Sequence, residues 1–147
     1  MKLSTRGRYA TRILLCIARE QDGGPVRKQL IADRERVSSD YVEQILVALR
    51  SSGLVNSHRG AKGGFTLARG PADITIWEVL QASEGPIGLV PCLGNEAHCR
   101  HTGTCVTRTL WEGAATLLHD YFQGVTLKEL VEREEKLIGE QVLMYDI

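Results

Sequence analysis

The sequence predicts a mostly α-helical fold with a small β-hairpin wing: a winged helix-turn-helix followed by a long dimerisation helix. Three observations support this fold class. Two short amphipathic segments lie on either side of a tight turn, a glycine-rich hairpin follows them, and the longest apolar repeat begins after residue 105. Helix, helix and then a hairpin with a basic tip is the element order of a winged helix.

The first three helices are predicted from apolar residues that recur at helical spacing. Residues 5–20 form the first helix, and residues 26–34 form a shorter one after the turn at 22–25. The third helix begins at Ser38-Ser39-Asp40, which are candidate N-caps, and Gly53 ends it. Cys16 lies at the edge of the first apolar stripe, and we expect it to be a small buried hydrophobe.

The polar face of the third helix carries side chains suited to DNA base edges. Glutamine can pair bidentately with adenine, glutamate can accept from cytosine N4, and serine can serve either way. The candidates are Ser39, Asp40, Glu43 and Gln44. Any solvated helix face carries similar residues, so an ordinary polar surface is the alternative.

Residues 54–59 and 65–69 are typical of two strands joined by the tip Gly60-Ala61-Lys62-Gly63-Gly64. Arg59 and Lys62 make this tip basic, and its glycines allow the backbone to come close to phosphates. A basic side chain here is suited to a narrow minor groove. The alternative is an ordinary glycine hairpin with no role in DNA binding.

Three further helices are predicted after the hairpin. Thr75 and Glu78 form a capping box, as do Thr126 and Glu129, and fraying is expected after Gly139. Between the two capping boxes, the helix from residue 106 is apolar over a wide arc. We expect the same helix of a second subunit to cover this arc, which gives a homodimer. Burial against the first helix is the alternative.

The 147-residue chain has no net charge, but its charges are divided unevenly. Residues 1–64 hold twelve Lys and Arg against six Asp and Glu, and residues 65–147 hold six against twelve. The basic half indicates a nucleic-acid partner, although its cations could simply be solvated, and the acidic half leaves room for a protein partner. No apolar run or signal-peptide pattern suggests a membrane or an export route, so we expect a cytoplasmic protein.

Three of the four cysteines, Cys92, Cys99 and Cys105, lie in a segment without helical or strand periodicity, which we expect to be a loop. In a reducing compartment such a cluster indicates a metal or redox site more than disulfides. Soft thiolates suit an iron–sulfur centre. Structural zinc with a histidine and a clusterless thiol switch are alternatives, although the cysteine spacing fits zinc poorly.

Four motifs coincide in this chain: the opening Lys2-Leu3-Ser4-Thr5-Arg6-Gly7-Arg8-Tyr9-Ala10, the segment from Ser38 to Leu54 with Glu43-Gln44, the wing from Arg59 to Phe65, and the three-cysteine segment followed by Leu110-Trp111. Together they resemble, over nearly the whole length, the Rrf-type winged-helix transcription regulators. The members of this family include IscR, NsrR and RirA, which this chain resembles in having three cysteines, and the clusterless CymR.

The resemblance implies a homodimeric, sequence-specific regulator in which the long helix makes the dimer. It implies that Cys92, Cys99 and Cys105 ligate an iron–sulfur cluster. It also implies a double-stranded DNA operator, with contacts from Ser38, Tyr41, Glu43, Gln44 and Arg59.

This chain departs from the family pattern at the fourth cluster ligand. The IscR histidine three residues beyond the last cysteine is replaced by Arg108, and the aspartate of one NsrR type is replaced by Arg8. A guanidinium stays protonated and has no lone pair to give a metal. Glu96, His98 and His101 lie within the segment, with His101 favoured, and an exogenous thiol or water is an alternative. The cluster type, 2Fe-2S or 4Fe-4S, therefore stays open.

The predicted organisation is a DNA-binding domain over residues 1–84, a cluster-binding segment over 85–105, and the dimerisation and C-terminal helices over 106–147. The sequence contains no nucleophile–base pair, phosphate loop or paired carboxylates, so an enzyme is not expected. We expect a transcription regulator that senses iron–sulfur status, redox state or nitric oxide.

Overall fold

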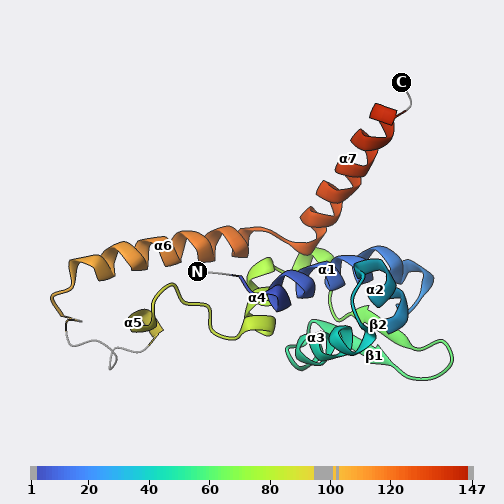
Figure 1. Ribbon diagram of the computed structural model, residues 1–147, viewed down its shortest axis with the longest axis horizontal. Coiled ribbons are helices and arrows are strands. Elements are labelled where there is room, and N and C mark those ends of the chain that lie inside the picture. Colours follow the sequence, from blue (N-terminus) through green and yellow to red (C-terminus); the bar gives the residue numbers. More distant parts are fainter. Residues whose placement is uncertain (1–2, 95–100, 102, 146–147) are drawn as a thin grey trace.

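Helix α1 (Thr5–Glu20) lies at the centre of a helical body in the computed structural model, which describes residues 3–94, 101 and 103–145 (Figure 1). Ser4 begins this helix by accepting a hydrogen bond from the Gly7 N–H at 3.2 Å. The apolar stripe of α1 is buried, and Cys16 is fully buried beside it, as expected. The other helices are α2 (Lys28–Glu35), α3 (Ser39–Ser51), α4 (Ile76–Glu84), α5 (Pro91–Gly94), α6 (Val106–Gly124) and α7 (Leu127–Tyr145), with 3-10 turns at Gln21–Gly23 and Pro71–Asp73.

The pair α2 and α3 forms the predicted helix-turn-helix. Arg36 adopts a left-handed conformation, with φ of 54°, in the turn between them. At the other end of α3, Gly53 has φ of 71°, and the N–H of Leu54 donates to the Leu49 carbonyl at 2.9 Å. This is a Schellman ending, which requires a residue that tolerates positive φ. The predicted stop at Gly53 is therefore confirmed.

The predicted hairpin is present as strands β1 (Val55–His58) and β2 (Gly64–Leu67), which pair antiparallel. Val26 was expected in the second helix, but it lies outside α2. Its N–H and C=O each form a 2.8 Å hydrogen bond with Phe65, so the segment before α2 pairs with the hairpin. These bonds hold Val26 in an extended conformation, and α2 begins only at Lys28.

The segment before α4 joins the winged-helix half to the two C-terminal helices. The Ile76 N–H donates to the Val125 carbonyl and the Leu127 N–H donates to the Ile74 carbonyl, both at 2.9 Å. Leu127 is buried in the main core with α1, and Phe122 packs against a second cluster that includes Ile76. The junction between α6 and α7 is thereby anchored to the body.

Helix α6 extends from the body towards α5 (Figure 1). One apolar stripe along α6, which we call the outer stripe, is exposed to solvent. Val106 is 80% exposed and Leu117 is 73% exposed, and Leu110 and Tyr121 lie on the same stripe and are also exposed. No residue of α6 is buried, and its main contacts are with α4 and α5: Phe122 packs beside Ile76, and the rings of His119 and Trp77 lie edge-on with centroids 4.7 Å apart. Burial of α6 against α1 is therefore not what the described residues show.

Two expectations about irregular structure were wrong. Helix α7 continues through Gly139 to Tyr145, where fraying had been expected. Its i,i+4 ion pairs lie in its first turns, and a glycine inside a helix lowers its stability without breaking it. In the cysteine segment, Pro91 opens the single helical turn α5, a position that suits its fixed φ. Among the described residues, no helix is long and apolar enough to span a membrane.

Candidate nucleic-acid interface and cysteine segment

The N-terminus of α3 presents a polar face to solvent. The Ser38 hydroxyl accepts a hydrogen bond from the Tyr41 N–H at 3.2 Å, which begins the helix. Asp40, Glu43 and Gln44 are exposed, and Ser39 is half-buried. Several side chains at the start of α3 are therefore accessible to a ligand.

Tyr41 has a packing role that the sequence did not indicate. Its ring lies edge-on to that of Tyr9, with ring centroids 5.7 Å apart, and the Arg12 guanidinium lies 5.3 Å from the Tyr9 centroid. Arg12 is also paired with the buried carboxylate of Glu35 on α2. This chain of contacts ties α1 and α2 to the start of α3, so Tyr41 sets the position of α3 as well as lining its exposed face.

Glu43 is paired with Lys28, the first residue of α2. The hydrogen bond and the charge of the Lys28 ammonium lower the pKa of the exposed Glu43 carboxyl. The Glu43 carboxylate therefore stays ionised, and the Lys28 ammonium partly compensates its negative charge. Sequence reasoning treated Glu43 as a free side chain, and it had no signal for a partner fifteen positions away.

The wing tip carries Arg59 and Lys62, both exposed. The tip turn is closed by the Gly63 N–H, which donates to the Gly60 carbonyl at 2.9 Å. Arg27, at the N-terminus of α2, donates from Nη2 to the Ala61 carbonyl at 2.8 Å. The N-terminal region of α2 therefore contacts both α3 and the wing, which brings the two predicted DNA-contacting elements onto one framework.

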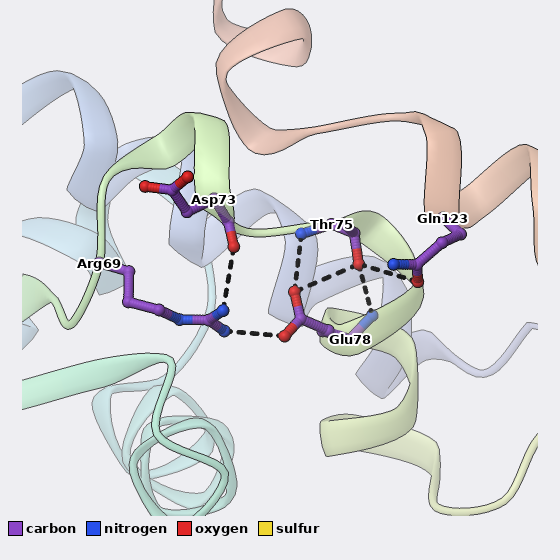
Figure 2. A network of polar contacts seen from close by, with 5 residues as sticks. All are labelled: Arg69, Asp73, Thr75, Glu78 and Gln123. Atoms are coloured by element: carbon purple, nitrogen blue, oxygen red, sulfur yellow. Dashed lines mark hydrogen bonds and ion pairs between the residues drawn. The ribbon is translucent and has the colours of Figure 1, made fainter.

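A polar network joins the end of the wing strand to α4 and α6 (Figure 2). Arg69 donates to the Asp73 carbonyl at 3.0 Å and pairs with Glu78 at 2.9 Å. Thr75 and Glu78 form the predicted capping box, and the Thr75 hydroxyl lies 3.4 Å from Gln123 Oε1 on α6. Partial burial raises the pKa of Glu78, but hydrogen bonds from Thr75 and Arg69 outweigh it and lower the pKa below its ordinary value.

Replacing Thr75 with alanine should lower the free energy of unfolding by about 1 kcal/mol, because the first turn of α4 loses its cap. Urea denaturation followed by circular dichroism measures this loss. A carboxyl with a lowered folded-state pKa stabilises above its unfolded pKa and loses that contribution as the pH falls. The difference between wild type and variant should therefore shrink below about pH 4.3, the ordinary glutamate pKa.

Thr116→Ala is the matched control, since Thr116 lies exposed within α6 and caps no helix. Its effect should stay within about 0.5 kcal/mol. An equal loss in both variants would mean that the cap at Thr75 contributes nothing of its own.

The cysteine segment is described in part. Cys92 lies in α5 and Cys105 immediately precedes α6, and both are half-buried free thiols. His101 is exposed in a turn. Cys99, Glu96 and His98 lie outside the described residues. Within the described ranges, no three potential metal ligands come together.

Cys105 has the features of a reactive or ligating thiol. Its Sγ lies 3.1 Å from the Thr107 hydroxyl. The hydrogen bond with Thr107, followed by that of the Arg108 N–H, lowers the pKa of the Cys105 thiol. Arg108 itself forms an ion pair with Glu112 at 2.8 Å, so its side chain has a structural role in α6. A thiolate is the form that binds metals and attacks electrophiles.

Comparison with known proteins decides the family. The Rrf2 family model, described as an iron-dependent transcriptional regulator, matches residues 3–133. The chain belongs to the Rrf2 family. This Rrf2 protein is 35% identical over 137 residues to the HTH-type transcriptional regulator IscR of Pectobacterium atrosepticum, covering 93% of this chain and 83% of the relative.

Solved structures agree with this assignment. The structure of CymR, the global cysteine regulator of B. subtilis, is 32% identical, with a TM-score of 0.77 over 90% of this chain and 98% of CymR. IscR of T. potens is 31% identical, with a TM-score of 0.76 over 93% and 90% of the two chains. The predicted winged-helix fold is thereby confirmed. The protein is a DNA-binding transcription regulator and not an enzyme.

Proposed function

We propose that this Rrf2 protein is a homodimer whose operator affinity depends on an iron–sulfur cluster held by Cys92, Cys99 and Cys105. The observation that carries the proposal is Cys105, a free and partly accessible thiol with a lowered pKa at the start of α6. Cys92, also free, lies on the other side of the segment. The IscR relatives and the iron-dependent family description support the same centre.

The donor set fits such a cluster chemically. Thiolates are the usual protein ligands of iron–sulfur clusters, and the lowered pKa of Cys105 favours the thiolate. His101 is exposed and is our candidate for the fourth ligand, whereas Arg108 cannot donate a lone pair and is paired with Glu112. When bound, the cluster supplies a centre that reacts with oxygen or nitric oxide and links the three thiolates.

Helix α6 connects this segment to the DNA-binding half. Cys105 precedes one end of α6, and Gln123 near the other end approaches the capping box of α4. Release of the thiolates would let the start of α6 move relative to α5. Because Arg69 links the same capping box to the end of the wing strand, that movement would change how the two halves of the dimer fit the operator.

The exposed surfaces support a dimer and its DNA contacts. The bare outer stripe of α6 would pack against the same stripe of a second subunit, with an apolar groove lined by Leu89, Val90 and Trp111 beside it. A two-fold dimer presents two α3 helices to half-sites about one helical turn apart. Arg59 and Lys62 would extend each contact into the flanking minor groove or phosphates.

Purification without oxygen, with iron and acid-labile sulfide assayed on one sample, tests the proposal. The wild type should contain both, and Cys92→Ala and Cys105→Ala should lose them. Cys16→Ala is the matched control, because Cys16 is buried in the core and should leave the iron content unchanged. Stoichiometric zinc, or no metal in the wild type, would overturn the cluster proposal.

A clusterless thiol switch is the second candidate, favoured by the lowered pKa of Cys105 and by the likeness to CymR. In that case the protein would contain no iron, and treatment with peroxide or persulfide donors would modify Cys105. Mass spectrometry of the modified peptide distinguishes this outcome from cluster loss.

Lys28 provides a test of the α3 contact. Its removal would leave the Glu43 carboxylate uncompensated near DNA phosphates, so Lys28→Ala should weaken operator binding by about five- to tenfold, equivalent to about 1 to 1.4 kcal/mol. Fluorescence anisotropy measures this on a duplex that the anaerobic protein selects from a random-site library. Adding Glu43→Gln should restore most of the affinity.

Lys128→Ala is the control for this experiment, since it removes an exposed lysine and its pair with Glu132, both on α7. It should leave binding unchanged. A double variant as weak as Lys28→Ala would instead indicate that the lysine contacts DNA directly.

A further inference from the structure

We propose that Arg27 is a positioning residue that holds the wing tip at the angle needed for DNA contact. This inference rests on the proposed contact between the wing and the operator. Arg27 lies at the N-terminus of α2, outside both predicted DNA-contacting elements. Its guanidinium reaches across 34 positions of sequence to the Ala61 carbonyl, which lies between Arg59 and Lys62 in the tip.

The base of the wing is fixed without Arg27. Two backbone hydrogen bonds of 2.8 Å join Phe65 to Val26, and the strand pairing runs from Val55–Leu67 to His58–Gly64. A Cβ on Gly64 would lie 2.5 Å from the Val26 carbonyl oxygen, so the two backbones are in close contact there. These contacts fix the strands of the wing, but they do not include its tip.

The tip itself has few restraints. Residues 59–63 are beyond the paired strands, and the turn is closed by the 2.9 Å bond from the Gly63 N–H to the Gly60 carbonyl. That bond shapes the turn but does not connect it to the body. Within the described part of the chain, the Arg27–Ala61 hydrogen bond is the side-chain tie between the body and this turn.

The chemistry of the tie suits positioning. A charged guanidinium donating to a carbonyl makes a stronger hydrogen bond than a neutral pair does. The turn contains Gly60, which has φ of 100°, together with Ala61 and Gly63, so its backbone can adopt other shapes once it is released. Arg59 and Lys62 would then sample a wide range of positions. Ordering them on the DNA would lower the binding affinity.

A direct phosphate contact by Arg27 is the competing interpretation, and a double-mutant cycle separates the two. The duplex is the one that the anaerobic protein selects from a random-site library. Arg27→Ala and Arg59→Ala should each weaken binding by about five- to tenfold. If Arg27 acts through the wing, adding Arg27→Ala to Arg59→Ala should cost less than about twofold more.

Two further readouts distinguish positioning from a general structural role. Hydroxyl-radical footprinting should show lost protection at the outer edges of the site in Arg27→Ala, with the central protection kept. The urea midpoint of unfolding should be unchanged, because Arg27 is exposed. Arg34→Ala, which removes an exposed arginine from the other end of α2 and its pair with Glu20, should leave the affinity within about twofold.

The outcomes separate the inference from the proposal beneath it. No effect of Arg59→Ala would overturn the wing contact and the inference together. A loss with Arg59→Ala but none with Arg27→Ala would overturn the inference alone. Additive losses would make Arg27 a direct DNA contact and would also overturn its role in positioning the wing.

Discussion

Replacing Leu117 with glutamate should separate the proposed homodimer and reduce operator affinity more than any other change considered for the described surface. Leu117 is 73% exposed in the single chain and belongs to the bare outer stripe of α6. In a two-fold interface the glutamate would be buried twice and without a partner, which costs several kcal/mol. The dimer dissociation constant should rise by at least about 100-fold, equivalent to about 2.8 kcal/mol.

The loss of DNA binding should be as large, because a monomer reads one half-site. Linked binding sites gain about 100- to 10,000-fold in avidity, and the variant forfeits this gain. Sedimentation equilibrium measures the dissociation constant, and fluorescence anisotropy measures the operator affinity. Thr116→Glu is the matched control, since it places the same charge on the polar face of the same helix. A Leu117→Glu protein that stays dimeric would show that the outer stripe of α6 is not the interface.

Replacing Gly63 with alanine should reshape the wing tip and weaken operator binding by at least about tenfold, or about 1.4 kcal/mol. A Cβ at this position would collide with the His58 carbonyl oxygen and lie 2.9 Å from the Gly60 carbonyl oxygen. Both neighbours are backbone, so the turn must open to accept the methyl group. Opening it displaces Arg59 and Lys62, while the helical core should still fold.

Gly139→Ala is the control for this wing variant. Its Cβ would meet nothing within 4 Å, and it lies within α7. This change should raise the unfolding free energy by up to about 1 kcal/mol through helix propensity, and it should leave DNA binding unchanged. Tight operator binding by Gly63→Ala, with an unaltered footprint, would contradict a role for the wing in recognition.

Local rules were enough to predict most of the helical framework. The stripe of α1, the Schellman ending at Gly53 and the capping box of Thr75 and Glu78 each depend on residues within a few positions of one another. Spacing and capping chemistry are therefore enough to predict them without knowledge of tertiary contacts. The order of these elements then predicted the winged-helix fold.

The wrong bound at Val26, and the contacts that the sequence did not indicate, involve segments that are distant in the chain. Val26 left the predicted helix because Phe65 bonds to its backbone, and Thr75 pairs with Thr126 across an isolated bridge. At the proposed DNA-binding surface, neither the Lys28–Glu43 pair nor the Arg27–Ala61 bond has a sequence signature. Sequence reasoning named the exposed candidates Glu43, Arg59 and Lys62, but it could not name the residues that hold them in place.

The central claim is that occupancy of the cysteine site sets operator affinity. It is tested most directly by anisotropy titrations of one anaerobic preparation before and after cluster removal by a chelator, with iron and sulfide assayed on each sample. The account predicts at least a tenfold change in affinity, about 1.4 kcal/mol, and no change on the same treatment of Cys105→Ala. Equal affinity of the loaded and depleted wild type, at verified iron contents, would contradict it.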